Sequence, residues 1–376
     1  ENCWRSTPMT THKVALLAGD GIGPEIMDEA IKVLHLVEER NAIEFELTPA
    51  LFGAAAYFET GKSFPEETIA ACDAADAILK GTIGLSHEES KKIPPDEGPE
   101  RGALLPMRKR YDTYANFRPV YLPHSLAHFS PLRPEIIGQG IDLMIIRELV
   151  GGLYFGTKTE GVDDAGRRYV HEMLEYNEEQ IQRVLKVAFD LARKRKKVLH
   201  NIHKDNVLKS SLLWNTVLDE VRVDYPEVNV KHVLVDAAAT NLCLDPTQFD
   251  VMVMENMFGD ILSDQCGGIL GSLGLMPSAC VGPTKSYYEP SHGSAPDIAG
   301  QGIANPYSMI GSVAMMLEMS FGMDGEARNL WQAMQSVFAD GYSTPDLARR
   351  GDAEHIITTA DFGDKVLSKL ATLPTP

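Results

Sequence analysis

The sequence predicts an α/β protein in which largely parallel sheets are flanked by helices, and three observations support this fold class. Short apolar runs alternate along the chain with segments of helical periodicity, a pattern typical of α/β units. The 376 residues, 44% of them hydrophobic, suffice for two lobes with separate cores. The turn at residues 19–23 reads Gly-Asp-Gly-Ile-Gly, which lacks the GxGxxG spacing of a true Rossmann fold.

The individual elements follow from local patterns. Residues 14–18 read as a buried strand, and a helix is expected from Pro24, a residue type suited to the first helical turn. The apolar stripe of that helix consists of Ile26, Ala30, Val33 and Val37. Asn177, with Gln180 three residues later, resembles a capping box that opens another helix. Further strands are expected at residues 77–79 and 143–146.

Composition excludes several classes of protein. With 35 basic and 53 acidic side chains the net charge is −18, so the overall field repels nucleic acid and anionic membrane surfaces. No apolar run reaches the roughly 18 residues that a membrane span requires. Residues 1–8 precede Met9 and lack the apolar core of a signal peptide. We expect a cytoplasmic protein with reduced thiols, because no CxxC pattern occurs among Cys3, Cys72, Cys243, Cys266 and Cys280.

Two aspartates spaced four residues apart, Asp260 and Asp264, follow Gly259. If a helix begins at Asp260, this spacing puts both carboxylates on one face, about 5–6 Å apart at the Cβ atoms. Converging carboxylates repel each other unless a cation such as Mg²⁺ neutralises them. The alternative is an ordinary helix start, where Asp is favoured by the positive end of the helix dipole. These residues alone leave the two interpretations even.

Three arginines stand beside apolar segments: Arg108, Arg118 and Arg147. A guanidinium at the end of an apolar strand needs an anionic partner, and three of them would suit a substrate with two carboxylates. Each arginine taken singly is more often part of a structural ion pair. The case for an anion site therefore depends on the set of three.

Several longer motifs resemble the isocitrate and isopropylmalate dehydrogenase family, and they occur in family order. They lie at residues 19–25, 114–119, 147–156, 256–264 and 289–306. Within the family, Ser-Pro-Leu-Arg-Pro-Glu at 130–135 and Gly-Gly-Leu-Tyr-Phe-Gly at 151–156 are most similar to the 3-isopropylmalate enzymes. The resemblance implies a first domain formed by residues 1–113 and 271–376 with the cofactor loop. It implies a second domain of residues 114–270 with the dimerisation, metal and catalytic residues.

The activity implied is NAD-dependent oxidative decarboxylation of (2R,3S)-3-isopropylmalate to 4-methyl-2-oxopentanoate and CO₂, in leucine biosynthesis. One alternative is a decarboxylating dehydrogenase of another substituted malate, such as D-malate, tartrate or homoisocitrate. Another is a non-catalytic regulatory or dinucleotide-binding homologue. The presence of Tyr154, Lys204 and all three implied metal-binding aspartates argues against that second alternative.

The resemblance also implies a homodimer with shared active sites. Asp260 and Asp264 are then ligands of Mg²⁺ or Mn²⁺, joined by Asp236 of the other copy, which also contacts the substrate. Lys204, likewise from the other copy, matches the general base, and Tyr154 matches the acid that protonates the enol carbon. Preceding Lys204 is His203, at a position where 3-isopropylmalate enzymes commonly have Asp.

The implied ligand contacts divide between substrate and cofactor. Arg108, Arg118 and Arg147 would bind the dicarboxylate substrate, and the apolar wall facing its isopropyl group would be Leu104, Leu105 and Val207. Asp297 would accept hydrogen bonds from the adenosine ribose and repel a 2′-phosphate, which favours NAD over NADP. The NADP-using relatives have Lys-Tyr where this chain has Asp297 and Ile298. The other implied cofactor contacts are Ile22, Glu100, Asn206, His292, Gly293, Ser294, Ala295, Ile298 and Asn305.

Overall fold

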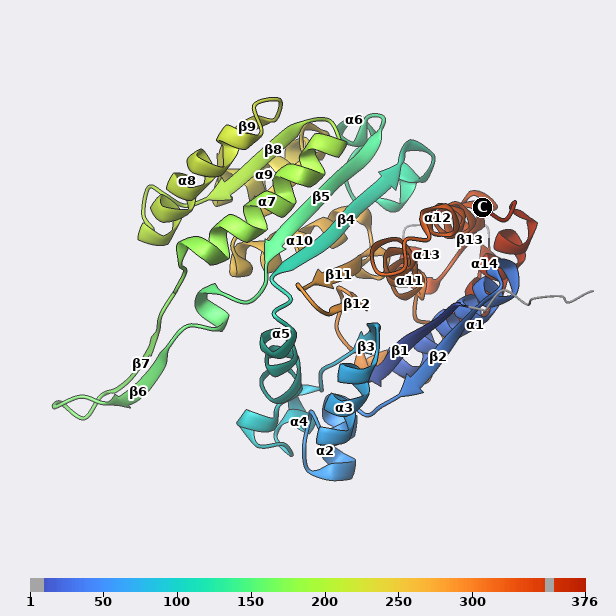
Figure 1. The fold of residues 1–376 in the computed structure, drawn as a ribbon, viewed down its shortest axis with the longest axis horizontal. Coiled ribbons are helices and arrows are strands. Elements are labelled where there is room, and N and C mark those ends of the chain that lie inside the picture. Colours follow the sequence, from blue (N-terminus) through green and yellow to red (C-terminus); the bar gives the residue numbers. More distant parts are fainter. Residues whose placement is uncertain (1–9, 349–354) are drawn as a thin grey trace, which may run out of the picture. The chain divides into compact units, whose positions relative to one another are not determined.

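In the computed structural model the chain divides into two compact units (Figure 1). The structure describes residues 10–348 and 355–376, so Cys3 and Met9 lie outside it. Unit 1 runs up to Leu104 and resumes at Tyr287, and unit 2 consists of residues 105–286. Both boundaries differ from the division expected from the sequence. One reason is that strand β11 (Pro277–Val281) pairs antiparallel with β4 (Ala115–Pro123) and so belongs to unit 2.

Unit 1 contains a parallel sheet with the order β2, β1, β3, β12. The buried strand expected at residues 14–18 is confirmed as the centre of β1, and the strand expected at 77–79 as part of β3. The sheet strands are β1 (Thr10–Gly19), β2 (Ile43–Pro49), β3 (Ala77–Thr82) and β12 (Ser286–Pro290). A small parallel pair consists of β13 (Tyr342–Ser343) and β14 (His355–Ile356).

Helix α1 (Gly23–Asn41) follows β1 through the glycine turn, as the sequence predicts. The expected apolar stripe of this helix is fully buried at Ile26, Ala30, Val33 and Val37. The other helices of unit 1 are α2 (Ala54–Thr60), α3 (Glu66–Ala74), α4 (His87–Ser90), α11 (Tyr307–Met319), α12 (Asp324–Ala339), α13 (Pro345–Ala348) and α14 (Thr359–Thr372).

Unit 2 is built on six neighbouring strands in the order β11, β4, β5, β10, β8, β9. Strand β4 runs antiparallel to both of its neighbours, whereas the four strands from β5 to β9 are mutually parallel. The strand expected at residues 143–146 lies within β5. The bounds not yet given are β5 (Gly140–Glu148), β8 (Val198–His203), β9 (Asn229–Leu234) and β10 (Val251–Met254).

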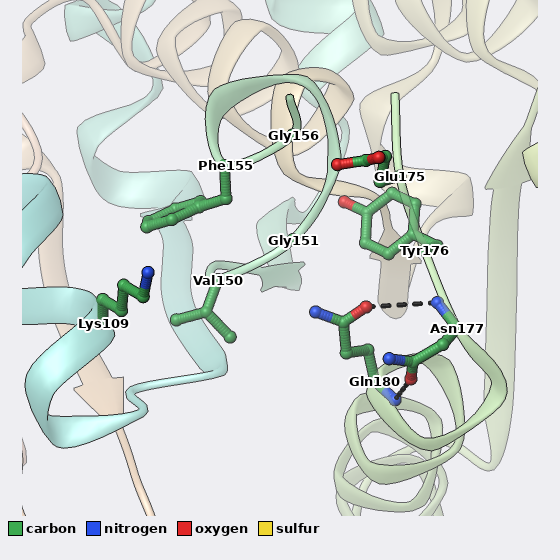
Figure 2. Close-up of a pocket in the computed structure, with 9 residues that line it drawn as sticks. All are labelled: Lys109, Val150, Gly151, Phe155, Gly156, Glu175, Tyr176, Asn177 and Gln180. Atoms are coloured by element: carbon green, nitrogen blue, oxygen red, sulfur yellow. Dashed lines mark hydrogen bonds between the residues drawn. The ribbon is translucent and has the colours of Figure 1, made fainter. Parts of the chain in front are cut away.

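Helices cover both faces of this sheet, with α7 (Glu178–Lys194) on one face and α10 (Asn256–Leu270) on the other (Figure 1). The capping box at the start of α7 is confirmed, because the side chains of Asn177 and Gln180 each accept a backbone N–H of the other residue (Figure 2). The remaining helices of unit 2 are α5 (Leu105–Tyr111), α6 (Pro134–Ile137), α8 (Lys209–Val221) and α9 (Val235–Leu244).

A two-stranded ribbon, β6 (Lys158–Val162) and β7 (Arg168–Glu172), extends from unit 2 (Figure 1). It exposes the apolar side chains of Val162, Tyr169 and Val170. None of the described helices combines the length and the apolarity needed to cross a membrane. The predicted fold class, largely parallel sheets flanked by helices, is confirmed.

Candidate active site

Helix α10 carries the two aspartates on one face, but it begins four residues earlier than the sequence suggested, at Asn256. The Glu255 side chain caps this end by accepting the backbone N–H groups of Met257 and Phe258 at 3.2 and 3.0 Å. No acidic residue lies in the first turn. The expectation of a start at Asp260 was therefore wrong, and so was the helix-start explanation of Asp260 and Asp264.

Guanidinium groups surround the two carboxylates. Arg147, at the end of β5, places Nη1 2.5 Å from Oδ1 of Asp260. Arg118, on β4, lies 3.4 Å from Asp264 and 3.9 Å from Asp260. The charge of Arg108, on α5, also acts on Asp260 and on Arg147. The fold thus brings together the three arginines and the two aspartates that the sequence analysis had selected separately.

Neutral side chains hold the arginines in place. Arg118 donates from Nε to Oδ1 of Asn116 at 2.8 Å and from Nη1 to Oγ of Ser263 at 2.6 Å. Arg147 donates from Nε and Nη2 to Oδ1 of Asn256 at 3.1 and 2.7 Å. A Cβ atom on Gly259 would lie 2.5 Å from Cγ of Arg147, so only glycine leaves room for this guanidinium stem.

Burial and the neighbouring charges shift the pKa values of these groups in different directions. Burial raises the pKa of Asp260, but the attraction of Arg147 and Arg118 outweighs it and leaves that pKa below the ordinary value. Burial and the charge of Asp260 raise the pKa of Asp264 against the attraction of Arg118. Burial lowers the pKa of Arg147 to about 10, so its guanidinium remains protonated at neutral pH.

The phenol of Tyr154 joins this group. Its hydroxyl donates to Oδ2 of Asp260 at 2.8 Å, and the guanidinium of Arg147 lies 5.8 Å from the ring centre. Burial and the nearby negative charge of Asp260 raise the pKa of Tyr154 to about 12. The phenol therefore keeps its proton at neutral pH, as a proton donor must.

Asp260 and Asp264 offer hard oxygen donors with side chains 37% and 54% exposed, the ligand type that Mg²⁺ and Mn²⁺ prefer. The charge of Asp260 contributes to the raised pKa of Asp264 after burial, and a cation bound between the two carboxylates would offset this repulsion. Within residues 10–348 and 355–376 no three His, Cys, Asp or Glu side chains come together as a metal site.

Asp236, the third aspartate of the predicted metal site, lies instead beside Lys204. Nζ of Lys204 donates to Oδ1 of Asp236 at 2.9 Å, and this hydrogen bond lowers the pKa of Asp236. The Asp236 side chain is 65% exposed, Val207 is 71% exposed, and Asn206 is exposed as well. These predicted site residues form a separate exposed group in unit 2.

In unit 1 the glycine turn and the predicted cofactor segment are in contact. The backbone N–H of Ile22 donates to the carbonyl of Ser294 at 2.8 Å, and a Cβ on Gly21 would lie 2.1 Å from that oxygen. The Ser294 hydroxyl donates to the carbonyl of Gly84 at 2.9 Å. Ala295 adopts a left-handed conformation with φ of 42°, which turns the chain sharply at this point.

The other predicted cofactor residues of unit 1 lie on the same segment or next to it. His292 is within 2.8 Å of the Ser308 hydroxyl, and burial lowers the pKa of its ring. Asn305 donates to Asp346 at 3.2 Å and accepts the backbone N–H of Tyr307. Among the predicted cofactor residues of this segment, Gly293 and Asp297 are exposed and Ile298 is half-buried.

Glu100 is exposed and lines a pocket of about 380 Å³ in unit 1 together with Leu85, Ile93 and Arg101. Leu104 and Leu105, the predicted apolar wall, are half-buried. The chain passes from unit 1 to unit 2 between these two leucines.

Sequence reasoning missed two polar residues, Asn256 and Tyr176, that contact residues of the site or the segment leading to it. Asn256 lies inside a quoted motif, but its contact with Arg147 spans 109 residues and leaves no local signal. Tyr176 packs on the glycine segment that leads to Tyr154, and a Cβ on Gly151 would lie 2.5 Å from its ring. Figure 2 shows Tyr176 and Gly151 among the residues that line a pocket of about 340 Å³ in unit 2.

Comparisons with known proteins agree with this geometry. Residues 13–366 match the isocitrate/isopropylmalate dehydrogenase family. The 3-isopropylmalate dehydrogenase of Geobacter sulfurreducens is 47% identical over 360 residues, covering 95% of this chain and 99% of that protein. The enzyme of the same name from Moorella thermoacetica is 46% identical over 359 residues, covering 96% and 99%. Among solved structures, isocitrate dehydrogenase from Methylococcus capsulatus superposes with a TM-score of 0.83 at 31% identity, covering 96% of this chain and 99% of that one.

Proposed function

The chain belongs to the isocitrate/isopropylmalate dehydrogenase family, and we propose that it oxidises and decarboxylates (2R,3S)-3-isopropylmalate to 4-methyl-2-oxopentanoate and CO₂ with NAD as oxidant. This reaction is a step of leucine biosynthesis. We further propose a cytoplasmic location, which the widely spaced cysteines without a CxxC pattern support.

One observation carries the proposal: three arginine charges converge on the two aspartates of α10 beside a protonated phenol. A dicarboxylate needs fixed cations, and buried guanidinium groups bind carboxylates in a defined orientation. The Arg147 and Arg118 side chains are 1% and 4% exposed, so both are desolvated before a ligand arrives. Their preorganisation supports recognition of the two carboxylates of a substituted malate.

The protein residues divide the proton transfers between them. Lys204 of the partner subunit takes the proton of the substrate hydroxyl while C2 loses a hydride. The β-carboxylate then leaves as CO₂, and Tyr154 donates its proton to C3 of the resulting enolate. Arg108, Arg118 and Arg147 hold the carboxylates and stabilise the negative charge that develops.

Two bound groups supply the remaining chemistry. A nicotinamide dinucleotide would accept the hydride, and Asp297, exposed in unit 1, favours NAD by accepting from the ribose 2′-hydroxyl. Mg²⁺ or Mn²⁺, held by Asp260 and Asp264 with Asp236 of the partner subunit, would act as a Lewis acid on the substrate oxygens.

Two features of unit 2 support the homodimer. The exposed ribbon of β6 and β7 is a two-stranded element of a kind that is marginally stable without further packing. Lys204 is half-buried and Asp236 is exposed, and they pair with each other, so this pair is accessible to a second copy of the chain.

The apolar wall of Leu104, Leu105 and Val207 would select the isopropyl group. Burying its three carbons contributes roughly 2.4 kcal/mol at about 0.8 kcal/mol per carbon, which is a preference of roughly fifty-fold over malate. Such a preference is moderate, so activity on related acids is expected to be measurable.

The decisive experiment measures NAD reduction in the presence of Mn²⁺ with 3-isopropylmalate, D-malate, tartrate, isocitrate and homoisocitrate. We expect the highest kcat/KM with 3-isopropylmalate. A higher value with another acid would overturn the substrate assignment and leave the family membership intact. Absence of turnover with all five acids would instead support a non-catalytic homologue. The matched control is Lys204→Ala, which should lose turnover with every acid.

A further inference from the structure

One buried amide at the start of α10 connects two parts of the site. The Asn256 side chain is fully buried, and its Oδ1 accepts from Nε and Nη2 of Arg147 at 3.1 and 2.7 Å. Its Nδ2 donates to the carbonyl of Gly151 at 3.0 Å. Asn256 therefore contacts both the arginine that faces Asp260 and the segment that leads to Tyr154.

The chemistry of these contacts fixes which way the amide points. A guanidinium has only donors, so the atom that faces Arg147 must be an acceptor. A backbone carbonyl has only lone pairs, so the atom that faces Gly151 must be a donor. Among side chains of this size, only asparagine offers both, because aspartate lacks the donor and leucine lacks both groups.

The neutrality of this amide matters as much as its geometry. Arg147 is 1% exposed and uses one edge of its guanidinium on Asn256, while Nη1 faces Asp260. A carboxylate at position 256 would form a buried ion pair with that edge and compensate the charge of Arg147. The amide satisfies the same donors without adding a second carboxylate to Arg147, so the charge of Arg147 is shared only between Asp260 and an anionic ligand.

The other end of the amide fixes the backbone before Tyr154. Gly151 donates its N–H to Oε2 of Glu148 at 2.9 Å, and its carbonyl accepts from Nδ2 of Asn256. Both backbone polar groups of Gly151 are therefore hydrogen-bonded. The Tyr154 hydroxyl lies three residues further on and donates to Asp260. A shift of Gly151 would therefore move the phenol relative to the carboxylates.

We propose that Asn256 is a positioning residue that fixes Arg147 and the backbone before Tyr154 without adding a second negative charge beside the guanidinium, which then faces only Asp260 and a substrate carboxylate. This inference rests on the proposed function only in naming the anion as the substrate. The Asn256 side chain links Arg147 to residues 151–154 through hydrogen bonds within unit 2, and these hydrogen bonds do not depend on which anion binds.

The principal test is Asn256→Asp, which nearly preserves the shape of the side chain. We expect KM for 3-isopropylmalate to rise roughly tenfold or more, the effect of weakening one hydrogen-bonded charge pair. KM for NAD should change by less than about twofold, because the side-chain hydrogen bonds of Asn256 go to Arg147 and Gly151 of unit 2. In a crystal structure of the variant the Gly151 carbonyl should move away from position 256, because two acceptors would face each other there.

The matched control is Tyr176→Phe. The Tyr176 hydroxyl accepts the backbone N–H of Asn256 at 3.0 Å, so this variant disturbs the same turn but none of the Asn256 side-chain contacts. We expect a lower melting temperature and an unchanged KM for 3-isopropylmalate. An equal rise of KM in both variants would show a general structural effect and overturn the proposal.

Two further results would also overturn it: an unchanged KM in Asn256→Asp, or an unchanged path of residues 151–154 in its crystal structure. If the wild-type protein turns over none of the substituted malates, the proposed function fails, and the crystal structure still decides the role of Asn256. If Asn256→Asp does not fold, Asn256→Ser, which is small and neutral, takes its place in the structural measurement. The Gly151 carbonyl should then move because its donor is gone.

Discussion

Glu148 gives the sharpest prediction for stability. It follows Arg147 at the end of β5, is fully buried, and accepts the backbone N–H groups of Val150 and Gly151 at 3.0 and 2.9 Å. Burial raises its pKa to about 7 against the effect of these hydrogen bonds. The other groups that act on it are the Tyr176 phenol and the more distant charge of Arg183.

The sign follows from proton linkage. In the unfolded chain this carboxyl titrates near its model value of 4.5, so it loses its proton before the folded form does. The contribution of Glu148 to the free energy of unfolding is therefore most favourable below pH 4.5, and it is lost as the pH rises through 7. The shift from 4.5 to about 7 corresponds to about 3 kcal/mol in full, of which about 2.5 kcal/mol falls between pH 5 and pH 8.

The test compares the wild type with Glu148→Gln by calorimetric melting at pH 5 and pH 8. The amide cannot ionise, so the transition of unit 2, residues 105–286, should fall roughly 5–10 °C more in the wild type than in the variant over this interval, at roughly 2–4 °C per kcal/mol for a domain of that size. Glu179→Gln, at an exposed position on α7, is the control and should follow the wild type. Parallel melting profiles for the wild type and Glu148→Gln would refute the reasoning.

Three further predictions concern the site. Tyr154→Phe should lower kcat roughly 10²–10⁴-fold in the NAD-reduction assay. The Mn²⁺ affinity, measured by titration calorimetry, should stay unchanged. Normal turnover by this variant would exclude Tyr154 as the proton donor. Gly259→Ala should displace Arg147 and lower the free energy of unfolding by roughly 1–3 kcal/mol, measured by denaturation. It should also raise KM for the acid substrate. Unchanged values of both would mean that helix α10 shifts to make room for the methyl group and Arg147 stays in place. Asp297→Lys combined with Ile298→Tyr should move the ratio of kcat/KM from NAD towards NADP, and an unchanged ratio would contradict the role of Asp297.

The sequence predicted the elements whose cause is local. The apolar stripe of α1 and the reciprocal caps of α7 follow from residues within one or a few helical turns, and both are confirmed. The start of α10 was missed because its cap is Glu255, outside the usual set of Ser, Thr, Asp and Asn. The two carboxylates still lie on one face, as their spacing predicts, because residues four apart share a helix face wherever the helix begins.

Long-range pairings had no comparable local cause. Arg147 and Asp260 are 113 residues apart, and Arg118 and Asp264 are 146 residues apart. Nothing near either arginine in the chain shows which carboxylate it meets. The resemblance to a known family grouped these residues in the sequence analysis. The order of the strands shows how the fold brings them together.

That order also explains why one chain holds the site in two parts. Four of the proposed functional residues of unit 2 lie at or just after the carboxyl ends of four adjacent parallel strands, and such ends meet at one edge of a sheet. Arg147 ends β5, Asn256 follows β10, Lys204 follows β8 and Asp236 follows β9. Strand β10 separates β5 from β8 and β9, so the edge presents an arginine-rich group at one end and the Lys204–Asp236 pair at the other. In the proposed homodimer a second copy of the same edge brings its lysine to the arginines, so the proposed chemistry and the proposed homodimer depend on each other.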